Sequence, residues 1–432
     1  MVSRRLLLPV LSGNILMLVS GAFKVWPVAY LQTIFKSDYV GMALMFELMG
    51  KIIGSIIFPL LAELIGRKYS LLLMTFPAVF SLIISEFFYG ILFLFCTARV
   101  FSGMIVGGSF AVLPIYIAEI SETKSKGSLI ASMFIFYNIG GEIFIPLLTG
   151  ITYDSSVLVS LCIIVLAIAY CITFALIAPE TPYYYLKKGR HNVAKIVLNK
   201  LRAANINTDI ELIEMQGHVN QNGQNAQENE RVIVCVRGPG WVKSGIMMFG
   251  ILVSQIVISV GVYETNIFTF IMHEMYNPSL IIGVAALLIC CISTALVDKI
   301  GRKLLMMIFY GGIAVSAATF IILFRFIPVE NVNAYLLPTI ILIGSQYSLF
   351  ILQTILLAEL FPLKIKMISS ALFTSLYFSS DIVIHLLMVI SSFFKYFLVV
   401  LISIGMLPIV RFFYLETRGK SLQRIQSILN KK

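Results

Sequence analysis

The sequence predicts an all-α membrane protein with twelve transmembrane helices in two bundles of six. Hydrophobic residues make up 59% of the 432 residues and charged residues only 12%, whereas a soluble domain carries about a quarter charged residues. Polar clusters divide the chain into about twelve apolar stretches, most of them close to the ~20 residues that cross a bilayer as a helix. Runs such as 281–297 do not alternate in polarity, which excludes a β-barrel.

Six apolar stretches precede residue 179 and form the first bundle, residues 1–178. The expected spans are 7–30, 39–61, 69–88, 91–118, 128–150 and 156–178. The first stretch follows Arg4 and Arg5 as the apolar part of a signal peptide would, but it continues to about Tyr30 without a small-residue cleavage site. We therefore interpret it as a membrane span.

A polar segment, residues 179–240, separates the bundles. It opens with Pro179-Glu180-Thr181-Pro182, continues as a helix-compatible basic stretch over 183–204, and contains a Gln/Asn/Glu tract at 220–230 whose composition predicts disorder. The second bundle, residues 241–415, has expected spans at 243–270, 279–297, 304–327, 335–358, 368–390 and 396–414. Residues 416–432 form a polar tail.

The net charge of +11 predicts orientation rather than nucleic-acid binding. All but six of the 32 lysines and arginines lie on the side of the N-terminus; the exceptions are Lys24, Lys36, Lys51, Arg99, Arg325 and Lys395. Basic residues accumulate on the cytoplasmic side of membrane proteins, so we expect both termini in the cytoplasm. Five of the six cysteines fall in apolar spans and Cys235 in the polar segment, so neither a disulfide nor a metal site is expected.

The two halves repeat one pattern of charges. Three motifs recur in the same order at offsets of 235 to 240 residues: Glu63-x-x-Gly66-Arg67-Lys68 as Asp298-x-x-Gly301-Arg302-Lys303, Glu119 with Lys126 as Glu359 with Lys366, and Glu180-Thr181 as Glu416-Thr417. A single acid and base after a helix commonly only anchors the helix end. Three motifs together predict a parallel repeat, with a site between two bundles near the membrane midplane.

These motifs resemble the sugar porter branch of the major facilitator superfamily along essentially the whole chain. Further matches are Arg99-x3-Gly103-x3-Gly107, Pro114-x-Tyr116-x-x-Glu119 and Glu359-x-Phe361-Pro362. Glu63 and Asn138-Ile139-Gly140 also resemble the insect facilitated trehalose transporter group. The resemblance implies a plasma-membrane carrier of a sugar or polyol that exposes a central site to each side in turn. It implies no cofactor, no nucleic acid and no obligate protein partner.

The resemblance also implies a network of charges that closes the cytoplasmic side. Opposite charges at helix ends suit this role because ion pairs between bundles can form in one state and break in the other. The residues concerned are Glu63, Arg67, Glu119, Lys126, Asp298, Arg302, Glu359, Lys366 and Glu416. Lys126 and Lys366 stand where the family commonly has Arg, so bidentate pairing is lost there.

The sugar-contacting positions of the family match poorly. Phe134 and Ala286 stand where the family has a glutamine and an asparagine, and a glutamine pair is reduced to Gln255 alone. The family's Pro-x-x-x-Trp region becomes Gln353-Thr354, and its Asn-Trp pair becomes Tyr377-Phe378. The candidate substrate contacts are Gln255, Asn138, Tyr137, Glu264 and Tyr377. Because each polar contact contributes about 0.5–1.5 kcal/mol, ordinary hexose affinity could be lost, and the substrate does not follow from the resemblance.

Several ionisable residues lie at membrane depth, where each is a functional candidate. They are Lys24, Glu47, Lys51, Arg99, Glu142, Glu264, Asp381 and His385. Glu47 with Lys51 and Asp381 with His385 are four residues apart, so each pair can neutralise itself. Alternatively, Asp381 and His385 carry a proton. Arg99 has Glu142 on an adjacent helix as a possible partner.

The leading hypothesis is a facilitative carrier of trehalose or a hexose-like solute. The alternatives are a non-transporting sensor or receptor that kept the scaffold, and a carrier of a non-sugar solute. The chain has no phosphate-binding loop, so primary pumping is unsupported. Four histidines and no paired catalytic constellation argue against an enzyme.

Overall fold

The computed structural model describes residues 4–34, 40–88, 91–144, 156–202, 208–220, 239–271, 278–327, 332–363, 365–387, 391–420 and 422–430. Apart from Asn220, the tract predicted to be disordered lies outside these ranges. The side chains of Glu264, Asp381 and His385 are likewise outside the described part, although their backbones belong to helices.

The first bundle contains the six predicted spans as helices. They are α1 (Arg4–Ile34), α2 (Val40–Ile65), α3 (Arg67–Leu73) with α4 (Thr75–Phe87), α5 (Leu92–Ile120), α6 (Lys126–Asn138) with the π-helical turn η2 (Ile139–Phe144), and α8 (Ser156–Ile177). The third span is divided at Met74, whose backbone stays helical (φ −66°, ψ −15°). Its two parts therefore act as one membrane-length segment.

The second bundle repeats this arrangement. Its helices are α13 (Pro239–Ile271), α14 (Pro278–Ile300), α15 (Arg302–Phe326), α16 (Val332–Leu360), α17 (Lys366–Leu387) and α18 (Ser392–Phe413). Within the described ranges, eleven helical segments of the chain are long and apolar enough to cross a membrane. The remaining predicted span, 368–390, overlaps α17, whose 22 residues reach about 33 Å. The predicted fold class is confirmed.

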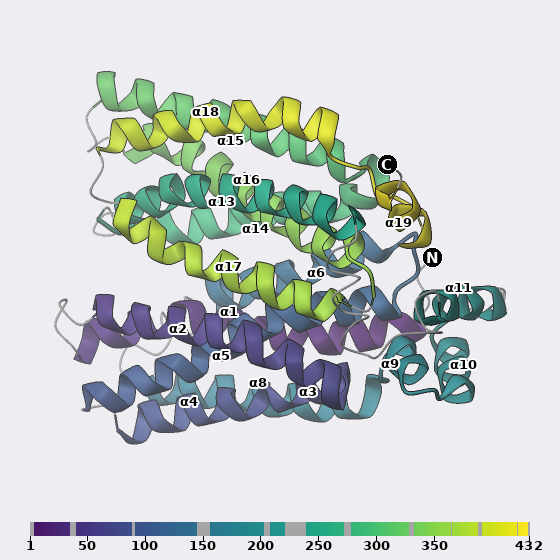
Figure 1. The fold of residues 1–432 in the computed structure, drawn as a ribbon. Coiled ribbons are helices and arrows are strands. Elements are labelled where there is room, and N and C mark those ends of the chain that lie inside the picture. Colours follow the sequence, from purple (N-terminus) through teal and green to yellow (C-terminus); the bar gives the residue numbers. More distant parts are fainter. Residues whose placement is uncertain are drawn as a thin grey trace.

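The two bundles lie side by side and meet along matching helices (Figure 1). α17 packs against α2 and α5, and α14 packs against α6 and η2. Within the first bundle, α5 approaches α2 closely because Gly103 and Gly107 of α5 face α2. A Cβ at Gly103 would lie 2.1 Å from the carbonyl oxygen of Glu47, and a Cβ at Gly107 would lie 1.9 Å from that of Lys51. Small residues allow such contact between membrane helices.

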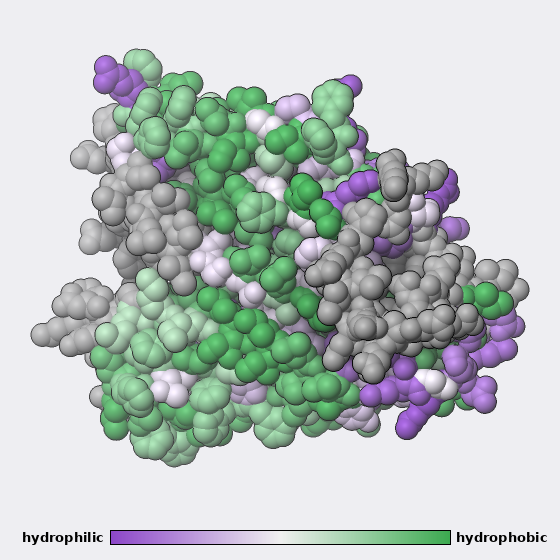
Figure 2. Space-filling view, in the orientation of Figure 1, coloured by the Kyte–Doolittle hydropathy of each residue, from purple (hydrophilic) through white to green (hydrophobic). Residues whose placement is uncertain are grey.

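The helix surfaces away from the bundle interface are apolar. Large side chains point outward from them, among them Phe76, Leu176 and Phe412, which are 70%, 81% and 77% exposed. Figure 2 shows apolar residues over the helices and hydrophilic residues gathered at one end. Lipid tails suit the apolar surface, so the exposed phenylalanines and leucines are the expected boundary with a bilayer.

Short helices and both termini share that hydrophilic end, which we name the inner end (Figure 1). The helices are α9 (Pro182–Lys187), α10 (His191–Leu201), α11 (Thr208–Asn220) and α19 (Leu422–Asn430). Thr181 caps α9 through a hydrogen bond from the N–H of Tyr184 (3.4 Å). Arg202 pairs with Glu211 (2.5 Å) and donates to the carbonyl of Ile120 (2.6 Å), which fastens the short helices to the end of α5.

Candidate functional site: a closed path between two bundles

Two glycine turns position the buried arginines of the inner end. Gly66 and Gly301 have φ of 108° and 106°, values that favour glycine, and Arg67 and Arg302 begin the helices that follow. Glu180 accepts hydrogen bonds from the N–H groups of Arg67 and Lys68 (3.0 Å each). Burial raises the pKa of Glu180, and the hydrogen bonds oppose that rise. A carboxylate here also complements the positive end of the helix dipole.

Glu416 makes the equivalent contacts in the second half. Its carboxylate accepts from the N–H groups of Arg302 and Lys303 (3.1 Å each). Both contacts lie within the second bundle, so Glu416 positions the start of α15 and does not itself reach the first bundle.

Each buried arginine pairs with two acids of its own bundle. Arg67 lies 3.1 Å from Glu63 and 3.2 Å from Glu119. The prediction that these ion pairs join the two bundles is therefore wrong. The turn at Gly66 directs Arg67 back toward Glu63, one turn earlier in the chain, and toward Glu119 at the end of α5. Glu63 also pairs with Lys187 of α9 (2.7 Å).

Arg302 has the same surroundings and adds a contact that crosses between bundles. Its guanidinium lies 3.0 Å from Asp298 and 2.8 Å from Glu359. The other oxygen of Asp298 accepts a hydrogen bond from the N–H of Ser128 (2.7 Å) in the first turn of α6. An acid of the second bundle thus caps a helix of the first.

Lys126 and Lys366 begin α6 and α17 beside this contact. Lys366 is only 2% exposed. Lys126 shares the first turn of α6 with Ser128, so its charge lies at the same helix end as the contact with Asp298. We name Asp298, Arg302, Glu359, Lys126 and Ser128 the inner junction.

Replacing Gly127 with alanine should disturb the inner junction. A Cβ there would lie 2.5 Å from Oδ1 of Asp298 and 2.6 Å from a guanidinium nitrogen of Arg302. Overpacking of this kind costs about 1–3 kcal/mol, so the closed form should lose about 5- to 150-fold in population relative to an inner-open form. Labelling of cysteines introduced at the inner end measures this. Gly245→Ala is the control, since a Cβ there meets nothing within 4 Å; equal labelling of both variants would contradict the expectation.

Aromatic side chains fill the centre of the bundle interface. We name six of them the central aromatic cluster: Phe110, Phe134, Tyr137, Phe350, Tyr377 and Phe378. The rings of Phe350 and Tyr377 stack with centroids 4.3 Å apart, and Phe110 of the first bundle lies 5.3 Å from Phe350 of the second. The cluster therefore joins the bundles through ring contacts where the family is expected to have polar groups.

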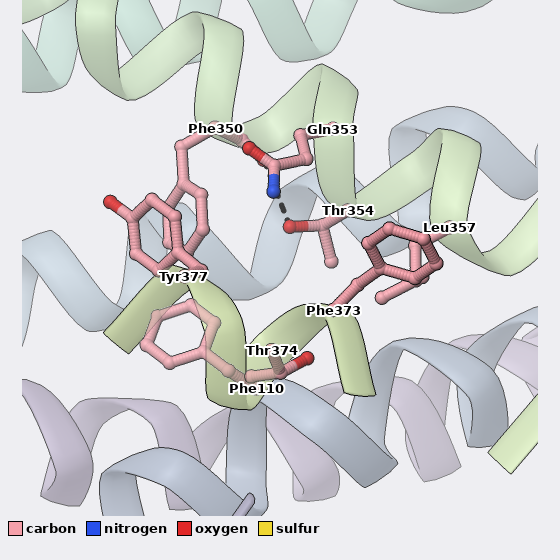
Figure 3. Close-up of a pocket in the computed structure, with 8 residues that line it drawn as sticks. All are labelled: Phe110, Phe350, Gln353, Thr354, Leu357, Phe373, Thr374 and Tyr377. Carbon is pink, nitrogen blue, oxygen red and sulfur yellow. Dashed lines mark hydrogen bonds between the residues drawn. The ribbon is translucent and has the colours of Figure 1, made fainter. Parts of the chain in front are cut away.

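A small cavity adjoins the central aromatic cluster (Figure 3). It is lined by Phe110, Phe350, Gln353, Thr354, Leu357, Phe373, Thr374 and Tyr377. The space open to the centre of a water molecule is ≈ 10 Å³, which holds about one water. A sugar does not fit in this space.

The predicted substrate contacts occupy different surroundings. Tyr377 lines the cavity, and Tyr137 packs on Phe110 with centroids 5.0 Å apart. Asn138 donates to the sulfur of Cys290 across the bundle interface (3.7 Å). Gln255 is fully buried, and neither polar atom of its side chain has a hydrogen-bond partner.

A second charged contact crosses the bundles farther from the inner end. Lys24 of α1 lies 2.6 Å from Glu142 of η2 and 2.9 Å from the hydroxyl of Tyr347 on α16. We name these three residues the outer junction. Tyr347 precedes Glu359 by twelve residues, about 18 Å along α16, so the cavity at Gln353 lies between the two junctions.

The partner expected for Arg99 is corrected by the structure. Arg99 pairs with Glu47 of α2, which Lys51 also contacts (2.8 Å), while Glu142 is held by Lys24. The close approach of α2 to α5 brings Glu47 to Arg99. Sequence reasoning also missed Ser128, which acts through its backbone N–H, and the contact of Lys24 with the hydroxyl of Tyr347.

Comparisons with known proteins agree with this architecture. A family model described as "Sugar (and other) transporter" matches residues 14–429. The facilitated trehalose transporter Tret1 of Bombyx mori is 27% identical over 402 residues, 88% of this chain and 76% of that protein. The probable metabolite transport protein CsbC of Bacillus subtilis is 24% identical, over 91% of this chain and 86% of the relative.

Solved structures share the fold. The proton:xylose symporter XylE bound to 6-bromo-6-deoxy-D-glucose superposes with a TM-score of 0.81 at 19% identity, covering 99% of this chain and 100% of that one. The inward-open conformation of XylE from E. coli gives a TM-score of 0.66 at 18% identity, covering 98% of both chains.

Proposed function

Because the chain belongs to the sugar transporter family, we propose that it carries a neutral sugar of the trehalose or hexose kind across a membrane by alternating access. The family is one of transporters and not of enzymes. The observation that carries the proposal is the presence of cross-bundle contacts on both sides of one central cavity.

The two junctions act as gates in this mechanism. Opening the inner end requires the hydrogen bond from Ser128 to Asp298 (2.7 Å) to break, and opening the outer end requires that from Lys24 to Tyr347 (2.9 Å) to break. Each contact is worth no more than a few kcal/mol, so binding energy of an ordinary substrate suffices to shift the balance between states. The closed cavity between them corresponds to an occluded intermediate.

The proposed substrate class follows the relatives, which include a trehalose transporter of Bombyx mori. We propose uniport. The ionisable residue of α1 at membrane depth is Lys24, which is a base and not an acid. Its charge is already balanced by Glu142 (2.6 Å), so transport needs no coupled proton there. Cytoplasmic termini are proposed from the basic residues of the inner end, and a plasma-membrane location is proposed from the resemblance to sugar porters.

Counterflow tests the proposal. Proteoliposomes are loaded with trehalose, glucose or sorbitol, and uptake of the labelled solute is measured with and without a pH gradient. We expect sugar exchange that ignores pH and falls about 2- to 10-fold in Gln255→Ala, the range of one or two lost hydrogen bonds. Gln216→Ala on α11, a half-buried glutamine whose side-chain amide lies 3.2 Å from Nδ1 of His191, is the matched control.

Other outcomes would redirect the assignment. Exchange driven by the pH gradient would move attention to Asp381 and His385 as proton carriers. If a monodisperse protein exchanged none of the three solutes, the sugar-carrier function would fail, and a receptor or a carrier of another solute would be the better account.

A further inference from the structure

The inner end of the first bundle carries aromatic side chains that the second bundle does not repeat. Tyr69 corresponds to Leu304 in the repeated Gly-Arg-Lys motif, and the three tyrosines at 183–185 have no counterpart after Thr417. The charges of the inner junction recur in both halves, whereas these tyrosines occur in one half only. They are therefore not part of the repeated pattern and call for a separate role.

The helix α9 holds tyrosine and lysine side chains against the ends of membrane helices. The hydroxyl of Tyr184 donates to the carbonyl of Leu64 at the end of α2 (3.3 Å), and Nζ of Lys188 lies 5.8 Å from the centroid of the Tyr184 ring. On α3, Nζ of Lys68 donates to the carbonyl of Ala175 near the end of α8 (2.8 Å). We name four residues of this region the basic shelf: Lys68, Tyr184, Lys188 and Arg190.

The basic shelf borders directly on the apolar surface of the first bundle. Leu64, whose carbonyl receives the Tyr184 hydroxyl, is 68% exposed, and Leu176, which follows Ala175, is 81% exposed. Figure 2 shows hydrophilic residues against apolar ones at this end of the molecule. Tyrosine and lysine suit such a border because each has an apolar body and a polar tip. The shelf therefore has the composition of a membrane–water interface.

The positive charges of the basic shelf have no acidic partner in the protein. Among the described residues, none of its three basic side chains forms an ion pair. Lys68 retains two N–H donors beyond its bond to α8. The acids close by are already engaged, since Glu63 pairs with Arg67 and Lys187, and Glu180 accepts the N–H groups that begin α3. The shelf thus presents positive charge to its surroundings.

We propose that the basic shelf binds the headgroup of an anionic phospholipid in the leaflet at the inner end, with the acyl chains along Leu64 and Leu176. The phosphate supplies the acceptor oxygens that lysine and arginine bind, and basic clusters at the end of a membrane helix select anionic lipids. A soluble anion would satisfy the charges but leave the exposed leucines uncovered. The inference concerns lipid and not sugar, so it does not depend on the proposed function.

Retention of lipid by the purified protein tests the inference. Protein in detergent is mixed with phosphatidylglycerol or with phosphatidylcholine, and native mass spectrometry counts the lipid that stays bound. Wild type should retain more phosphatidylglycerol than phosphatidylcholine. Each basic residue near a membrane surface contributes about fivefold to the binding of anionic lipid. The shelf variant, Lys68→Gln with Lys188→Gln and Arg190→Gln, should therefore bind phosphatidylglycerol about a hundredfold more weakly.

A second triple variant is the matched control. Lys299→Gln with Arg418→Gln and Arg424→Gln removes the same charge from exposed positions at the inner end of the second bundle. It should retain phosphatidylglycerol as wild type does. If the shelf variant does not fold, Lys188→Gln with Arg190→Gln keeps the contact of Lys68 with α8 and should bind about 25-fold more weakly.

A soluble headgroup separates a lipid site from a site for free anions. Glycerophosphate has the phosphate but no acyl chains, so it should not displace phosphatidylglycerol from wild type at equal concentration. Displacement would overturn the inference in favour of a free anion. Equal retention of phosphatidylglycerol by the shelf variant and the control variant would also overturn it, because the position of the charges would then not matter.

Discussion

Replacing Glu359 with glutamine should shift the protein toward an inner-open form and slow exchange by at least tenfold. Glu359 accepts hydrogen bonds from Arg302 (2.8 Å) and from the hydroxyl of Thr417 (2.6 Å). Arg302 is 1% exposed and is neutralised by this carboxylate together with that of Asp298. A hydrogen bond to a charged group contributes about 1.5–3 kcal/mol.

The labelling rate of Cys290 measures this shift. Cys290 is buried at the interface of α6 and α14, against Asn138, and opening of the inner end should expose it. We expect maleimide labelling to be about tenfold faster in Glu359→Gln than in wild type. Glu122→Gln, in the turn before α6, is the control, since Glu122 forms no ion pair among the described residues. Unchanged labelling and exchange in Glu359→Gln would show that the inner junction is not a gate.

Replacing Glu47 with glutamine should have the largest effect on stability. Glu47 neutralises Arg99, which is 1% exposed, and also contacts Lys51 (2.8 Å). Removing one member of a buried ion pair costs about 3–5 kcal/mol because the other charge is left unpaired. We expect a lower yield of monodisperse protein and a lower free energy of unfolding in detergent.

A double variant tests this explanation. Glu47→Met with Arg99→Met removes both charges, and apolar replacement of a whole buried pair is often neutral or stabilising. The double variant should therefore recover most of the stability that Glu47→Gln loses. If Glu47→Gln were as stable as wild type, the carboxylate of Glu47 would not be needed to neutralise Arg99.

Helix positions were predictable from the sequence because the bilayer fixes the length of an apolar span. The expected span 335–358 coincides with α16 (Val332–Leu360), and 156–178 with α8 (Ser156–Ile177). The repeated charges were equally informative: Glu180 and Glu416 occupy equivalent places, each accepting from two N–H groups after a glycine turn. The equivalence of Glu180 and Glu416 could be predicted from the repeated motif and its spacing, without knowing how the helices pack.

Partners between helices were not predictable, since they depend on which faces meet. Arg99 is bound to Glu47 and not to Glu142 because Gly103 lets α2 approach α5. The i, i+4 spacing of Glu47 and Lys51 was visible in the sequence and is confirmed as a contact (2.8 Å).

The hydrogen bond from Ser128 to Asp298 has a consequence for sequence variation. Its donor is a main-chain N–H, which every residue except proline supplies, while its acceptor is a specific carboxylate. A saturation library should therefore tolerate almost any residue at position 128 and reject nearly all at position 298. A distant homologue can therefore keep this contact with any residue but proline at the position of Ser128. The acid at the position of Asp298 is what indicates that the contact is present.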